Sequence, residues 1–233
     1  VSFAGTNLAP NDPVGISFWI ISVAMVAATA FFFLESLRVQ GKFRTSLVVG
    51  GLICLVAGVH YFYMREVWAS TGSSPTVFRY VDWIVTVPLQ MVEFYLILAA
   101  VTAVSLGVFW RLLIGTVVMV VAGYLGEAGF IDTTIGFVVG MGGWAYILYE
   151  IFSGEASASA SKAAPAVQSA FNTMKWIVTI GWAIYPLGYF LGYMTGGGAD
   201  ADTLNIVYNV ADFINKIGFC LAIWAAATTQ ADA

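Results

Sequence analysis

The chain has 233 residues, of which 60% are hydrophobic and only 9% are charged. Soluble domains carry about 25% charged residues, so this composition excludes an ordinary water-soluble protein. The net charge of −4 argues against a nucleic-acid partner, and the single histidine argues against a multi-histidine metal site, so neither is expected. The chain is expected to fold in a lipid bilayer.

Long apolar runs follow one another along the whole sequence. A helix of about 20 apolar residues crosses the hydrocarbon core, and the short alternating segments of a membrane β-barrel do not occur in the sequence. The prediction is an all-α membrane protein in which residues 1–233 form a single seven-transmembrane-helix bundle. The predicted spans are 14–37, 46–69, 76–103, 108–127, 131–153, 170–195 and 203–229.

Basic residues gather on alternate connections between these spans. Arg65 is the only basic residue on one side, against six on the other. Those six are Arg38, Lys42, Arg44, Arg111, Lys162 and Lys175. Because cytoplasmic loops are enriched in lysine and arginine, the N-terminus is predicted outside and the C-terminus in the cytoplasm.

The connections and glycines allow further predictions. The serine- and alanine-rich stretch 154–169 predicts a mobile cytoplasmic linker, and the glycines at 196–198 predict a plain outer turn. Gly136–Gly140 and Gly188–Gly192 have the spacing that lets membrane helices approach closely, and packing inside the bundle is favoured over contact between copies. Cys54 and Cys220, both inside apolar spans, are expected to be small core residues.

Charged residues inside the spans are the most informative feature. A charged side chain at the bilayer centre costs roughly 2.5–3.5 kcal/mol, so such residues mark a functional site. They are Arg79, Asp82 and Glu93 in the third span, Asp212 and Lys216 in the seventh, and the titratable His60 in the second.

The third span carries polar residues at helical spacing. Asp82, Thr86, Gln90 and Glu93 follow at steps of four, four and three and therefore share one helix face. Glu93 lies about 16 Å along the axis from Asp82, and Arg79 lies one turn outward of Asp82. The pattern indicates an axial file of proton-bearing groups.

The seventh span adds a lysine one turn from a carboxylate. Asp212 and Lys216 share a face, and Asp82 is expected to oppose the same lysine. An inert ion-pair network that only joins helices is the alternative, but it leaves Glu93 unexplained. In an apolar pocket the neutral lysine amine is favoured, and this amine forms Schiff bases with aldehydes.

Aromatic residues crowd the same depth of the bundle and suggest a long, flat ligand. Each of them alone is better explained by core packing. They are Trp83, Trp144, Trp182, Tyr185 and Tyr208. Pro186 follows Tyr185 and predicts a bending point in the sixth span.

Three motifs together resemble the microbial rhodopsins, and among these the proteorhodopsins. They are RYVDWIVTVPLQMVE at 79–93, WAIYP at 182–186 and DFINK at 212–216. The match covers all seven spans in order, and the combination is highly specific.

The resemblance implies a retinal protein. Lys216 would hold all-trans retinal as a protonated Schiff base, with Asp82 as counterion and proton acceptor and Asp212 as second counterion. Glu93 would be the cytoplasmic proton donor and His60 the hydrogen-bond partner of Asp82. Arg79 and Thr86 would complete the proton-transfer site. The residues implied to contact the retinal are Trp83, Gln90, Met119, Gly123, Trp144, Trp182, Tyr185, Pro186, Tyr208 and Asn215.

The resemblance also indicates which ion is moved and which colour is absorbed. Asp82, Thr86 and Glu93 match the proton-pump pattern rather than that of the sodium or chloride pumps. Gln90 stands where blue-absorbing members have glutamine, so blue absorption is predicted. Trp144 is bulky where carotenoid-binding relatives have glycine, so no carotenoid antenna is expected.

The predicted function is a light-driven outward proton pump, not an enzyme, in the bacterial inner membrane. The alternative is a photosensory rhodopsin with a slow photocycle that signals to a partner; a proton-coupled transporter is disfavoured because no inverted repeats are visible. The resemblance implies a homo-oligomer, a pentamer or hexamer, in which His60 contacts Trp19 of a neighbour. No outer acidic pair for proton release is recognised near Asp200 and Asp202.

Overall fold

The computed structural model describes residues 9–195 and 200–231, and within them it is helical without strands. Seven segments are long and apolar enough to cross a membrane, which confirms the predicted helical bundle. The first five are built from α1 (Pro13–Glu35) with the short turn η1 (Ser36–Arg38), α2 (Gly41–Thr71), α3 (Thr76–Ala99), α4 (Leu106–Glu127), and α5 (Thr133–Phe152) with α6 (Glu155–Ala160). The sixth comprises α7 (Pro165–Trp176), η2 (Ile177–Gly181), α8 (Ile184–Tyr189) and η3 (Phe190–Met194), and the seventh α9 (Ala201–Phe213), η4 (Ile214–Gly218) and α10 (Phe219–Ala231).

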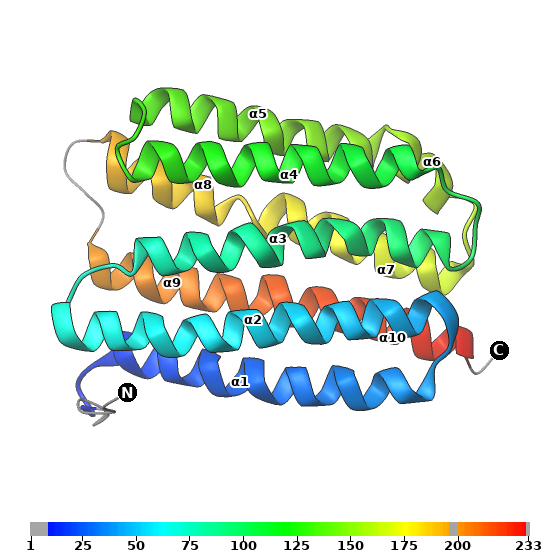
Figure 1. The fold of residues 1–233 in the computed structure, drawn as a ribbon, viewed down its shortest axis with the longest axis horizontal. Coiled ribbons are helices and arrows are strands. Elements are labelled where there is room, and N and C mark those ends of the chain that lie inside the picture. The colour runs from blue at the N-terminus through cyan, green and yellow to red at the C-terminus, as the bar shows by residue number, and fades with distance from the viewer. Residues whose placement is uncertain (1–8, 196–199, 232–233) are drawn as a thin grey trace.

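The segments lie side by side along one direction, and α1 begins at the end of the bundle opposite to that where α10 finishes (Figure 1). We call the end where α1, α3, α5 and α9 begin the N-terminal end. Neighbours in sequence pack together, α1 on α2 and α4 on α5, and the seventh segment also packs against α1 and α2. The glycine turn predicted at 196–198 lies outside the described residues.

Aspartates begin several helices at the N-terminal end. Asp12 accepts a hydrogen bond of 2.8 Å from the Gly15 amide, and Asp132 accepts from the amides of residues 134 and 135. Asp200 accepts from both the amide and the hydroxyl of Thr203. Side-chain oxygens at this position satisfy free helix amides, so these acidic residues start helices.

The prediction of a mobile linker over 154–169 is wrong. Residues 155–160 form α6 and Pro165 begins α7, because alanine favours helix strongly and proline fits the first helical turn. Glu155 also bonds to Arg111 (Nη2 to Oε2, 2.7 Å) and to Ser105 (3.1 Å). The third helix ends at Ala99, four residues before the predicted 103.

The glycine pairs pack inside the bundle, as predicted. A Cβ added at Gly136 would lie 2.7 Å from the Cα of Gly126 on α4, so only glycine allows this approach of α4 and α5. A Cβ at Gly140 would lie 3.3 Å from a carbonyl oxygen of α4. The second pair faces α9 and meets side chains there. Cys54 and Cys220 are buried, as expected of core residues.

Wide π-helical turns interrupt the sixth and seventh segments. A π turn loosens the normal backbone ladder and is frequent at functional sites. Side chains bond to carbonyls of these turns: Asn215 Nδ2 donates to Gly181 O at 3.0 Å, and Trp144 Nε1 to Val178 O at 3.0 Å. Gln90 Nε2 donates to Asn215 O at 2.6 Å. Thus side chains of α5 and η4 hold η2 in place, and a side chain of α3 holds η4 in place.

The bending point predicted at Pro186 lies slightly earlier in the chain. Between η2 and α8 the Tyr185 amide bonds to Trp182 O at 3.1 Å, which is the tighter spacing of a turn. Proline lacks an amide hydrogen and crowds the preceding turn, so the irregularity falls just before it.

Candidate functional site

The buried ammonium of Lys216 is the centre of the site. Its side chain lies in η4 and is about 2% exposed, with Nζ 2.5 Å from Asp82 Oδ2 and 2.7 Å from Asp212 Oδ2. The sequence pattern predicted that these three groups meet, and in the structure they are in contact. Two carboxylates offset the large desolvation penalty of a buried cation.

The two carboxylates have different surroundings. Asp212 accepts hydrogen bonds from Tyr61 (3.0 Å, Oδ2) and Tyr185 (2.8 Å, Oδ1). Asp82 bonds only to Lys216, and its Oδ1 has no hydrogen-bond partner among the described residues. Of the two, Asp82 therefore has the unoccupied oxygen that can take a proton. Tyr61 was not predicted, since nothing in the sequence of the second span marks it.

Arg79 lies toward the N-terminal end of the bundle from this ion pair. Its Nη2 donates to Asn205 Oδ1 at 2.8 Å and to Asn209 Oδ1 at 2.9 Å. The guanidinium lies over the rings of Phe18 (5.4 Å) and Tyr208 (5.3 Å). Arg79 makes no ion pair within the described chain, so neutral side chains hold it, and sequence reasoning missed both asparagines.

His60, the predicted partner of Asp82, and Thr86, another predicted residue of the proton-transfer site, both bond to backbone oxygens. His60 is half-buried and its Nδ1 lies 2.9 Å from Val56 O, in its own helix. The predicted hydrogen bond between His60 and Asp82 is not formed, since Asp82 Oδ2 bonds to Lys216 and its Oδ1 has no partner among the described residues. Thr86 donates to the backbone oxygen of Asp82 at 3.0 Å and not to its carboxylate.

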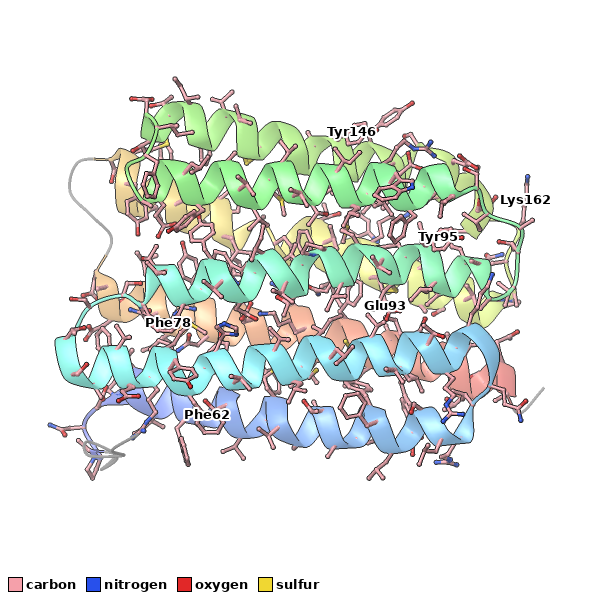
Figure 2. All side chains as sticks on the ribbon, viewed as in Figure 1. Phe62, Phe78, Glu93, Tyr95, Tyr146 and Lys162 are labelled. Atoms are coloured by element: carbon pink, nitrogen blue, oxygen red, sulfur yellow. The ribbon has the colours of Figure 1, made fainter. Side chains whose placement is uncertain are left out.

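Glu93 is isolated from the ion pair. It lies on α3 toward α2, in the half of the bundle away from the N-terminal end (Figure 2). Its side chain is fully buried, and neither carboxyl oxygen has a hydrogen-bond partner in the part of the chain that the structure describes. The Ser46 hydroxyl lies near this carboxyl group; it is also buried and has no hydrogen-bond partner among the described residues. Such a carboxyl is stable only with its proton, since an unpaired charge there costs several kcal/mol.

A cavity extends from Lys216 between α3, α4, α5 and α8. It encloses about 830 Å³ outside protein atoms, part of it continuous with solvent. The ring centroids of Trp83 and Tyr185 lie 5.0 Å apart on its wall. The predicted contact residues that line it are Trp83, Gln90, Met119, Gly123, Trp144, Trp182, Tyr185, Pro186 and Tyr208. Asn215 does not line the cavity; it joins the two π turns.

The bundle and its buried ion pair define a seven-helix membrane protein with a buried lysine that lines an aromatic cavity. The family model for bacteriorhodopsin-like proteins matches residues 12–230, so the chain belongs to the bacteriorhodopsin-like family. Blue-light absorbing proteorhodopsin from Gamma-proteobacterium Hot 75m4 is 54% identical over 228 residues, which cover 97% of this chain and 91% of that protein. Green-light absorbing proteorhodopsin from Gamma-proteobacterium EBAC31A08 is 52% identical over 226 residues, covering 97% and 91%.

A solved structure gives the same result. The crystal structure of blue light-absorbing proteorhodopsin from Med12 matches with a TM-score of 0.81 and 54% sequence identity, covering 94% of this chain and all of that one. The resemblance to proteorhodopsins predicted from the motifs is thereby confirmed, and with it a multi-pass, rhodopsin-type light-driven transporter rather than an enzyme.

Proposed function

We propose that this chain is an outward, light-driven proton pump that binds all-trans retinal on Lys216 and absorbs blue light. The observation that carries the proposal is the position of Lys216, which lines an aromatic cavity and pairs with two carboxylates, of which Asp82 has one oxygen without a hydrogen-bond partner among the described residues. The names of the relatives, blue- and green-light absorbing proteorhodopsins, support it.

The residues present fit a long, flat aldehyde. A buried amine opens into a cavity walled by tryptophan and tyrosine rings, with glycines Gly123 and Gly140 leaving space on the α4–α5 side. Bound there, retinal would supply the absorption of light and the change of shape that redirects the N–H on Lys216.

The first proton movement follows from the difference between the two carboxylates. In the dark, Lys216 Nζ carries a proton between Asp82 and Asp212, and the opposite charges stabilise one another. Once the N–H points elsewhere, this mutual stabilisation weakens. Each oxygen of Asp212 already accepts from a tyrosine, Tyr61 or Tyr185, whereas Asp82 Oδ1 has no partner among the described residues, so Asp82 takes the proton.

The replacement proton comes from Glu93. Burial without hydrogen-bond partners keeps this carboxyl neutral and ready to donate. It lies on the same helix face as Asp82, about 16 Å away along α3. Asp82 contacts Lys216 while Glu93 lies farther from the N-terminal end of the bundle, so one cycle moves one proton along the bundle.

Direction and assembly belong to the same proposal. The excess of lysine and arginine on one side favours an external N-terminus, which makes Glu93 cytoplasmic and the net movement outward. Localisation in a bacterial inner membrane, a pentameric or hexameric assembly, and the lack of a carotenoid antenna beside Trp144 are proposed on the family resemblance.

Light-driven acidification tests the function. Cells that express the chain with retinal should acidify their medium on illumination, and a protonophore should abolish the signal. A coloured protein that does not acidify the medium would favour the photosensory alternative. An absorption band bleached by hydroxylamine would show the imine link to Lys216.

Glu93→Gln is expected to slow the recovery of the dark state on the order of 10²-fold, because the internal proton donor is lost. Flash spectroscopy measures the recovery, and azide, a small proton carrier, should restore the rate. An unchanged rate in the absence of azide would remove Glu93 from the donor role.

Gln90→Leu is expected to move the absorption maximum to longer wavelength. The amide dipole near Lys216 stabilises positive charge at the nitrogen, which favours the ground state, and leucine removes this dipole. An absorption spectrum measures the change. Gln40→Leu, at an exposed helix start outside the cavity, is the matched control and should leave the spectrum unchanged.

A further inference from the structure

A carboxylate outside all three sequence motifs lies at the far end of the aromatic cavity. Glu127, the last residue of α4, lines this cavity at the N-terminal end of the bundle. The hydroxyl of Tyr193 donates to its Oε1. Glu127 is half-buried whereas Tyr193 is exposed, so the pair extends from the cavity to the surface.

Polar groups lie between Asp82 and Glu127. Arg79 is one turn from Asp82, and its guanidinium lies 5.3 Å from the ring of Tyr208. Arg79 Nε and Nη1 are buried without hydrogen-bond partners among the residues described, so they are free to change partner. Tyr208 and Tyr80 line the same cavity as Glu127.

The other described carboxylates at the N-terminal end of the bundle either cap helices or do not line the cavity. Asp12, Asp132 and Asp200 are occupied as helix caps. Bonds from Thr203 hold the pKa of the Asp200 carboxyl below its usual value, so it stays ionised. The exposed carboxylates that do not line the cavity are Glu66 and Asp202.

We propose that Glu127 is the exit relay, the carboxylate that takes the proton from Asp82 and passes it to water on the outer side. This inference rests on the proposed proton-pump function. Asp82 gives up its proton and becomes a carboxylate, while the Glu127 carboxylate becomes a carboxylic acid. Glu127 then loses that proton to bulk water. Arg79 and the Tyr208 hydroxyl lie between the two carboxyl groups, and Tyr193 orients the outer one.

The test uses the retinal-reconstituted protein in vesicles with a pH-sensitive dye outside. In Glu127→Gln, transfer from Lys216 to Asp82 should keep its rate, whereas release to the dye and re-ionisation of Asp82 should slow on the order of 10²-fold. Tyr193→Phe keeps the carboxylate and should slow release less. Glu66→Gln, an exposed carboxylate of the same end, should release protons at the wild-type rate.

Infrared difference spectra separate a relay from a structural role. Besides the band of protonated Asp82, a second transient carboxylic acid band should be present in wild type and Glu66→Gln and absent in Glu127→Gln. Glu127→Asp should retain this second band and most of the release rate. Release and band unchanged in Glu127→Gln would overturn the inference while leaving the pump intact. A coloured wild type that releases no proton would instead defeat the proposed function itself.

Discussion

Lys216→Ala is expected to yield a protein with no visible absorption after reconstitution with all-trans retinal. The side chain supplies the only amine on the cavity wall within the described residues, so no covalent link forms. The substitution also leaves Asp82 and Asp212 buried without their cation, which destabilises the fold by about 3–5 kcal/mol if both stay ionised. An absorption spectrum and a thermal melt measure the two effects.

The control for this experiment is Lys162→Ala, an exposed lysine beyond α6 (Figure 2), which should keep full colour. Because the charge imbalance alone threatens folding, Lys216→Ala is also combined with Asp212→Asn. The double variant should fold more stably than the single one and stay colourless. A hydroxylamine-sensitive visible band in either variant would contradict the assignment of Lys216.

Asp82→Asn is expected to keep its colour and lose proton transport, with acidification falling at least about 10²-fold. Asparagine has nearly the volume of aspartate, so packing is retained, but it cannot take the proton of Lys216. Loss of the negative charge beside Lys216 should also move absorption to longer wavelength, because the ground-state charge at the nitrogen loses a stabilising partner. Vesicle acidification and a spectrum test both points.

Asp202→Asn, an exposed carboxylate outside the cavity, is the matched control and should pump normally. Asp212→Asn gives a second comparison, since two tyrosines already occupy the Asp212 carboxylate. If Asp82→Asn pumped at the wild-type rate, Asp82 would not be the acceptor, and Asp212 would be the carboxylate beside Lys216 that accepts the proton.

The seven helices were predictable from the sequence because their cause is local. Bilayer thickness demands about 20 apolar residues per crossing, and this demand is visible in any one run without knowledge of its neighbours. The intrahelical part of the site was predictable for the same reason. Asp82 and Glu93 share a face of α3, and Asp212 and Lys216 are one turn apart, so helical periodicity alone relates them.

Contacts between helices were decided only by the tertiary structure. Tyr61 bonds to Asp212 across 151 residues of sequence, and Arg79 bonds to Asn205 across 126. Apolar periodicity does not define the rotation of one membrane helix against another, because a buried helix is apolar on most of its faces. For the same reason the sequence did not show that the His60 ring bonds to its own helix or that Glu127 reaches the cavity.

The remaining differences have related causes. Residues 154–169 have the composition of a linker, yet the ion pair of Glu155 with Arg111 helps to hold part of them as helix. Irregular turns at η2 and η4 persist because side chains of other helices, including Gln90, bond to their carbonyls. The sequence alone determined the membrane class, the helices and the chemistry along each helix. The folded structure decided which of those groups meet, because that depends on distant residues brought into contact.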